Sequence, residues 1–222
     1  MRFLTGLPGL DERLGGGVAS RTLTLVYGEE KSGKTSLVLM MCAFATRQIP
    51  AAYIDCSGRL QSARISQIMR AIGGDEDKLY ILSIESFQDQ EKVILSLHDL
   101  MPPARLLVFD DFTALHRLEL SGDIRLDMPV YRRLAFQVAA LKEAALRNDL
   151  AVVIVGHVHD IPDRGESRAV AHRILGYWSD TVLRLGLDPK TRVGRVVIEK
   201  PERIEATAYK ITGSGLMQAQ PP

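Results

Sequence analysis

The sequence predicts one α/β domain, built on a doubly wound and mostly parallel sheet that antiparallel strands extend near the C-terminus. Two observations predict this fold class. Apolar strand-like runs alternate with segments of helical period up to about residue 156, and three strand-like runs separated by polar turns follow residue 176. The 222 residues suit one domain with a sizeable core. We therefore expect residues 1–222 to form a single domain, with a loosely ordered tail over residues 211–222.

Each element follows from its period and from the turn residues that bound it. The chain up to residue 110 predicts strands at residues 22–27, 51–55, 79–82 and 105–110, and helices at residues 35–47, 61–72 and 88–100. Further on, it predicts a helix from Pro129 to about residue 148, a buried strand at residues 150–156, and strands at residues 180–187, 195–199 and 207–211. Ligands of such sheets bind at the carboxyl ends of the parallel strands. The site should therefore lie in the loops after those strands.

Charge and composition exclude several classes of protein. A net charge of +1 gives no overall signature of nucleic-acid binding, so any such binding must be local. The longest apolar runs are too short to cross a bilayer, and the N-terminus lacks a signal pattern. Two cysteines in a chain of this size do not predict a disulfide. We expect a cytoplasmic protein that does not bind membranes.

The segment GEEKSGKT satisfies the phosphate-loop pattern G-x-x-x-x-G-K-[ST], with a strand before it and a helix after it. Its backbone N–H groups and the following helix dipole suit phosphate. We predict that Lys34 contacts the β- and γ-phosphates of a bound nucleotide and that the Thr35 hydroxyl binds Mg²⁺. The alternative is a polar turn with a surface lysine, which the flanking elements disfavour. The predicted nucleotide-binding residues are Gly28, Glu29, Glu30, Lys31, Ser32, Gly33, Lys34, Thr35 and Ser36.

A second acid should hold the same Mg²⁺ from the end of a buried strand, and Asp110 fits that position. Asp111 follows it, and we expect its side chain to point to the other face. A hydrolase also needs a group that orients or deprotonates the attacking water. Ser57, after the neighbouring strand, is too short and too weak a base, and Asp55, Asp111 and Glu85 remain as candidates.

Taken in order, several motifs resemble those of the RecA/RadA recombinase superfamily, and most closely its short archaeal RadA paralogues of the RadB type. The resemblance spans nearly the whole chain. It is carried by TGLPGLD at residues 5–11, LGGG at 14–17, the phosphate loop, YID at 53–55, the strand ending at Asp110, VVIVGHVHD at 152–160 and LGYWSDTVLRL at 175–185. It implies a RecA-like core that binds ATP with Mg²⁺ and acts in DNA recombination and repair.

The resemblance also implies roles for residues outside the phosphate loop. Arg64 falls where the family has an arginine that stacks on adenine, although it could equally be a solvated helix residue. His157 falls where recombinases have a glutamine that senses the γ-phosphate and opens the second DNA-binding loop; a capping or loop histidine is the alternative. That loop, residues 157–173, is nearly balanced in charge, and its DNA-binding candidates are Arg164, Arg168 and Arg173. Residues 116–128 occupy the first DNA-loop position.

Two departures from the family pattern limit the expected activity. Ser57 stands where recombinases have a catalytic glutamate, so we expect ATP binding with slow hydrolysis at most. The chain also starts directly at the core, without the helical DNA-binding domain and aromatic linker of the recombinases, so a long filament is not expected. The expected partners are a RadA-like recombinase or another DNA-repair protein, and single-stranded DNA. The alternative is a KaiC-like regulatory or motility-associated module that acts only through protein partners.

Overall fold

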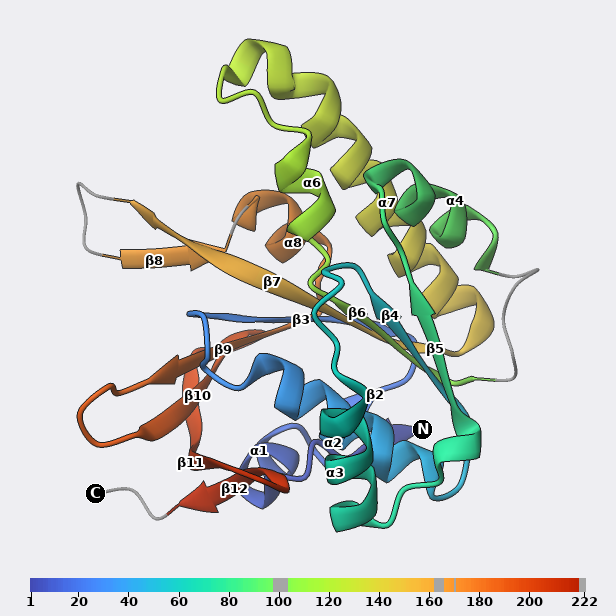
Figure 1. The fold of residues 1–222 in the computed structure, drawn as a ribbon. Coiled ribbons are helices and arrows are strands. Elements are labelled where there is room, and N and C mark those ends of the chain that lie inside the picture. The colour runs from blue at the N-terminus through green and yellow to red at the C-terminus, as the bar shows by residue number, and fades with distance from the viewer. Residues whose placement is uncertain (98–103, 162–165, 170, 220–222) are drawn as a thin grey trace.

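The computed structural model describes residues 1–97, 104–161, 166–169 and 171–219. Most strands form a single sheet (Figure 1). Its strands follow the spatial order β12 (Gly215–Ala219), β11 (Ile204–Thr212), β10 (Val193–Lys200), β9 (Thr181–Leu187), β3 (Thr22–Gly28), β7 (Ala151–Ile161), β6 (Leu106–Asp110), β4 (Ala51–Asp55) and β5 (Leu79–Ser83). A further strand, β8 (Glu166–Ala169), pairs with β7, and β1 (Arg2–Phe3) pairs with β2 (Val18–Ala19) in a small separate sheet.

Helices cover both faces of this sheet (Figure 1). One face carries α1 (Pro8–Arg13), α2 (Lys34–Thr46) and α3 (Ser62–Ile72), and the other carries α4 (Phe87–Leu95), α7 (Ile124–Asn148) and α8 (His172–Trp178). The short helix η1 (Glu76–Lys78) precedes β5, and α6 (Ala114–Leu118) leads with the first turns of α7 into a projection above the sheet (Figure 1). Two clusters of buried apolar side chains separate the sheet from these two helix layers. This is a doubly wound arrangement.

Strand direction confirms the predicted fold class. Every neighbouring pair from β9 through β3, β7, β6 and β4 to β5 is parallel, whereas β9, β10, β11 and β12 pair antiparallel. The central strands β3, β4 and β6 are buried along almost their whole length because helices cover both faces, whereas β5 at the edge of the sheet is largely exposed. The carboxyl ends of β4 and β6 are aligned, with Asp55 opposite Asp110. Asp110 and the residues that follow β4 therefore lie at the same end of the sheet.

The longest helix begins earlier than the sequence predicted. Pro129 was expected to open it, but α7 starts at Ile124, and the Asp123 side chain caps it by accepting a hydrogen bond from the Arg125 backbone N–H. An aspartate N-cap satisfies an otherwise unpaired donor, and this outweighs the preference of proline for the first turn. The expected first DNA loop therefore shrinks to the residues between α6 and α7. At the other DNA-loop position, β7 continues to Ile161 and β8 pairs with it, where only loop was expected.

The expectation of a loosely ordered tail from residue 211 was wrong for the residues up to Ala219. Residues 215–219 form β12, which pairs with β11. The Leu216 side chain is only 4% exposed, and the Gly9 backbone N–H donates a 2.7 Å hydrogen bond to the Gln218 side-chain oxygen. Tertiary packing thus orders a segment whose glycines and polar residues suggested a coil. Residues 220–222 lie outside the described part of the chain.

The N-terminal motif TGLPGLD has a structural role. The buried Asp11 carboxylate accepts hydrogen bonds from the Thr5 backbone N–H and hydroxyl, both 2.7 Å, and from the Gly6 N–H at 3.2 Å. Its own backbone carbonyl accepts from Gly16 and Gly17. These bonds fold the N-terminal segment into a compact corner. In the portion of the chain that the structure describes, no helix is long and apolar enough to span a membrane.

Candidate nucleotide-binding site

The phosphate loop connects the end of β3 to the start of α2, as predicted. Gly33 caps α2 in the left-handed region with φ +96°, and a Cβ there would lie 2.8 Å from the Leu216 side chain. At Gly28 a Cβ would lie 2.0 Å from the Leu185 carbonyl oxygen. A side chain is therefore excluded at Gly28 by the backbone of β9, and at Gly33 the left-handed backbone conformation favours glycine. The loop backbone is free to wrap a phosphate at the N-terminus of α2.

Lys34 already points into this loop. Its ammonium group donates hydrogen bonds to the backbone carbonyls of Gly28 at 2.8 Å and Glu29 at 2.6 Å. Burial lowers the pKa of Lys34 below its usual value, although the carboxylates of Asp111 and Asp110 act in the opposite direction. Glu29, Glu30 and Lys31 are exposed around it, whereas Ser32 and Ser36 are buried. The lysine thus places a positive charge where phosphate oxygens would lie.

Thr35 and Asp110 meet at the position expected for Mg²⁺. The Thr35 hydroxyl donates a 2.6 Å hydrogen bond to the Asp110 carboxylate, and the buried Tyr53 hydroxyl donates to the same oxygen, also at 2.6 Å. Burial raises the pKa of Asp110 above its usual value, against the effect of these two donors. The described residues contain no group of three or more His, Cys, Asp or Glu side chains that could hold a metal. The oxygen pair fits Mg²⁺, which takes few protein ligands and completes its shell with phosphate and water.

A cavity of about 530 Å³ lies beside the phosphate loop and has Arg64 in its wall. Its other lining residues come from the start of α2 and from the β11–β12 turn. The Arg64 guanidinium donates to the Ser36 hydroxyl at 2.9 Å and to the Gly213 carbonyl at 2.7 Å, and the Gln67 side chain accepts a third bond at 2.9 Å. These hydrogen bonds are made by the nitrogens at the edge of the guanidinium, so they fix the orientation of its plane. This geometry suits stacking against a nucleobase.

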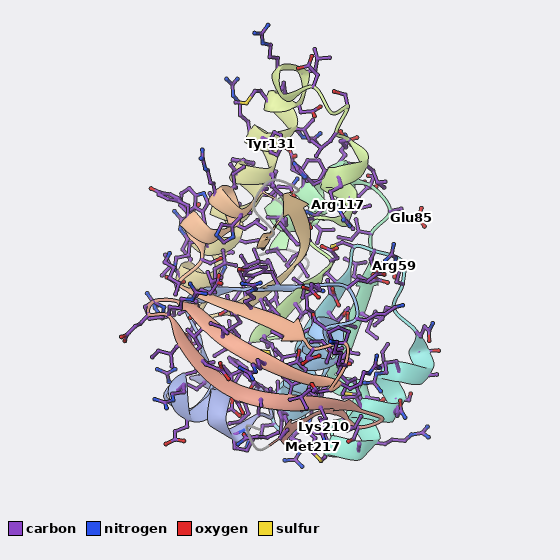
Figure 2. All side chains as sticks on the ribbon, turned by 90° about the vertical axis from the view of Figure 1, so that its left-hand side faces the viewer. Arg59, Glu85, Arg117, Tyr131, Lys210 and Met217 are labelled. Carbon is purple, nitrogen blue, oxygen red and sulfur yellow. The ribbon has the colours of Figure 1, made fainter. Side chains whose placement is uncertain are left out.

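A second cavity of about 510 Å³ opens on the other side of Lys34 and Thr35, where the γ-phosphate would project. Ser57, Asp110 and Asp111 line this cavity. Three further charged residues line it and lie along one side of the molecule in Figure 2: Arg59, Glu85 and Arg117. Asp111 was expected to point to the opposite face. That expectation was wrong, because β6 ends at Asp110 and strand alternation no longer applies to the next residue.

The nearby carboxylates serve local structure. Both oxygens of Asp55 accept backbone hydrogen bonds from the following loop, from Ser57 and Gly58 at one oxygen and from Leu60 at the other. The Asp111 carboxylate accepts from Thr113 and lies 3.4 Å from the Arg117 guanidinium. Because these oxygens already accept hydrogen bonds from the protein, fewer lone pairs are left to accept one from an attacking water. Glu85 is exposed at the rim of the cavity.

Among the residues that the structure describes, the other predicted positions do not come together in one site. The His157 backbone pairs with Gly28 beside the phosphate loop, whereas its side chain is outside the described set. Arg164 also lies outside the described residues, and Arg168 belongs to β8, with its side chain likewise not described. Arg173 is exposed on α8 and lines a separate cavity of about 320 Å³.

Two tyrosines that the sequence did not single out for a role contact the site. Tyr53 bonds to Asp110, and the Tyr209 hydroxyl of β11 donates to the Ser32 carbonyl within the phosphate loop. Tyr53 lies in the YID motif, so its position next to a site strand was visible in the sequence. The link between residues 209 and 32 depends on how the C-terminal strands fold back, and no local pattern predicts it.

A phosphate loop after a central strand, with its threonine bonded to an aspartate at the end of a nearby parallel strand, is the arrangement of a phosphate-loop nucleotide-binding core. The Rad51 family model matches residues 1–219, and the chain belongs to that family. It is 31% identical to the DNA repair and recombination protein RadB of Pyrococcus horikoshii, over 97% of this chain and 94% of that protein. It is 30% identical to the RadB protein of Archaeoglobus fulgidus, over 97% and 98% of the two chains. The crystal structure of a RadB recombinase superposes with a TM-score of 0.80 at 28% identity, covering 98% of this chain and all of that one. These similarities confirm the resemblance that the motifs indicated.

Proposed function

We propose that this protein is a nucleotide-dependent accessory of homologous recombination and DNA repair. It binds ATP with Mg²⁺, hydrolyses ATP slowly at most, and modulates a RadA-like recombinase on single-stranded DNA. The observation that carries the proposal is the combination of a complete phosphate loop with a serine at the position of the water-activating glutamate. The family relation supports the recombination role, and the near-complete overlap with RadB relatives supports it over a KaiC-like module.

The binding half of the proposal rests on the geometry of Lys34, Thr35 and Asp110. Lys34 supplies charge to the phosphates, and the oxygens of Thr35 and Asp110 suit Mg²⁺. Bound Mg²⁺ would neutralise charge on the phosphates. The expectation of slow hydrolysis rests on the residues of the second cavity. Ser57 is a weak base, and both oxygens of Asp55 accept hydrogen bonds from backbone N–H groups. Asp111 accepts a hydrogen bond from Thr113 and forms an ion pair with Arg117. The remaining candidate, Glu85, is exposed at the rim of the cavity, so we infer that water beside the γ-phosphate lacks a well-placed base.

Fluorescence anisotropy with labelled single-stranded DNA tests the nucleotide-dependent DNA function. Binding should be measured at low and moderate salt, with and without Mg-ATP, because electrostatic DNA contacts weaken steeply as salt rises. We expect binding whose affinity changes with Mg-ATP, and a Lys34→Ala variant that retains binding but loses this dependence. Absence of binding at low salt in both states would contradict the DNA role and favour a module that acts through proteins alone.

Steady-state phosphate release tests the slow-hydrolysis part. Turnover should be low with or without single-stranded DNA, while Mg-ATP still binds by calorimetry. Turnover at the rate of a DNA-stimulated recombinase in the unmodified protein would contradict this part of the proposal and leave the binding part intact.

A further inference from the structure

Tyr53 is a buried tyrosine in β4 whose hydroxyl reaches the metal-binding end of the neighbouring strand. Its side chain is 1% exposed and packs in the apolar cluster under α2 and α3. In the β4–β6 register Tyr53 lies opposite Val108, so its ring extends along the strand toward Asp110. The hydroxyl donates a 2.6 Å hydrogen bond to the Asp110 carboxylate. A hydroxyl in this apolar setting needs a partner, and Asp110 supplies it.

The Asp110 oxygen that accepts this bond also accepts the Thr35 hydroxyl at 2.6 Å. The two donors are not equivalent once a metal binds. Thr35 lies at the start of α2 and its oxygen is a metal ligand in the proposed site, so its bond to Asp110 is the one that metal binding alters. The Tyr53 ring is fixed by the core around it and cannot follow. Tyr53 is therefore the donor that keeps the carboxylate oriented in the metal-bound state.

We propose that Tyr53 is a positioning residue for Mg²⁺: through its hydrogen bond it holds the Asp110 carboxylate in the orientation that binds the metal or its water shell. It touches neither nucleotide nor metal. The proposal rests on the proposed function, since it concerns how the same site binds Mg-ATP. Residues that orient a metal ligand from behind commonly matter almost as much as the ligand, and their loss weakens metal binding by about 10- to 100-fold.

The test separates nucleotide affinity from metal affinity in a Tyr53→Phe variant. Phenylalanine keeps the ring in the core and removes only the hydroxyl. Binding of a fluorescent ATP analogue is measured first in EDTA and then as Mg²⁺ is added, and bound Mn²⁺ is followed by electron paramagnetic resonance. We expect unchanged affinity in EDTA, a 10- to 100-fold increase in the Mg²⁺ concentration required for half-maximal effect, and an altered Mn²⁺ spectrum.

Tyr80→Phe is the matched control, because Tyr80 lies on the adjacent strand β5 with its side chain 43% exposed. It should leave the metal dependence unchanged. An unchanged Mg²⁺ requirement in Tyr53→Phe would overturn the proposal. So would an equal loss of affinity in EDTA and in Mg²⁺, which would indicate a general effect on the phosphate loop. If unmodified protein bound no nucleotide under either condition, the proposed function would fail, and this inference with it.

A double-mutant cycle with Asp110→Asn gives a second measurement that does not depend on the size of the single effect. If Tyr53 acts through the carboxylate, Tyr53→Phe should shift the Mg²⁺ requirement far less in the Asp110→Asn background than alone. Additive effects would mean that the hydroxyl acts by another route and would overturn the proposal. Urea unfolding of each variant establishes that the comparison is made between folded proteins.

Discussion

Restoring a carboxylate at Ser57 should convert a nucleotide-binding site into a faster hydrolytic one. The Ser57 hydroxyl donates a 2.9 Å hydrogen bond to the Asp55 carboxylate and accepts a 3.2 Å hydrogen bond from the Arg59 backbone N–H. The Ser57→Glu substitution removes both hydrogen bonds. Asp55 retains the backbone N–H groups of Ser57 and Gly58, at 2.9 and 3.0 Å, so the loop should hold at a cost of about 1 kcal/mol for each lost bond. The cavity of about 510 Å³ beside Ser57 has room for the longer side chain.

A positioned general base contributes roughly 10²- to 10⁴-fold to such a step. We expect the lower end, about 10²-fold, which is about 2.7 kcal/mol off the barrier, because the new carboxylate enters a site that did not evolve around it. The assay is steady-state phosphate release at saturating Mg-ATP, with and without single-stranded DNA. Ser57→Gln is the matched control, since it has nearly the same size and hydrogen-bonding reach but cannot accept the proton. Equal rates for the glutamate, glutamine and unmodified proteins, all binding Mg-ATP normally, would refute the assignment of Ser57 to the catalytic position.

Three further outcomes follow from the structure. Lys34→Ala removes the ammonium that would meet the phosphates, and calorimetry should record at least a 10-fold loss of Mg-ATP affinity, since a hydrogen bond to a charged group contributes roughly 1.5–3 kcal/mol. Leu216→Ala empties a 4% exposed position in β12, and urea unfolding should report a loss of about 2–5 kcal/mol; an unchanged midpoint would mean that β12 does not pack as described. Burial lowers the pKa of His116 from 6.5 to about 4. As pH falls, His116 is therefore protonated in the unfolded chain before it is protonated in the folded one. The free energy of unfolding should decrease by on the order of 2 kcal/mol between pH 7 and pH 5. The same urea titration of His116→Leu should lack this decrease, and an equal decrease in the variant would assign it to other groups.

The sequence was sufficient where local chemistry determines structure. The alternation of strands and helices predicted the parallel sheet, because burial on both faces leaves a continuous apolar run in each of its central strands. The phosphate loop and Asp110 were found because their function requires particular residue types directly after a strand. The structure brings the loop and Asp110 together through Thr35.

The sequence was insufficient where distant segments decide the outcome. Nothing near residue 216 indicates that its side chain packs against Gly33, because that contact joins segments far apart in the sequence. The start of α7 was misjudged because two local signals compete, and the Asp123 cap prevailed over the proline. Asp111 was misjudged because strand alternation was extended one residue beyond the end of β6. The hydrogen bonds from Tyr53 to Asp110 and from Tyr209 to Ser32 likewise join residues that no spacing rule connects.

The last two strands have a consequence for how stability is shared across the fold. Tyr209 and Leu216 contact the phosphate loop from β11 and β12, and the Gly213 carbonyl between them accepts a hydrogen bond from Arg64. The site walls therefore exist only in molecules in which these two strands have paired with the rest of the sheet. Under the proposed function, Mg-ATP would bind only such molecules, and its binding free energy would protect the C-terminal strands against local unfolding.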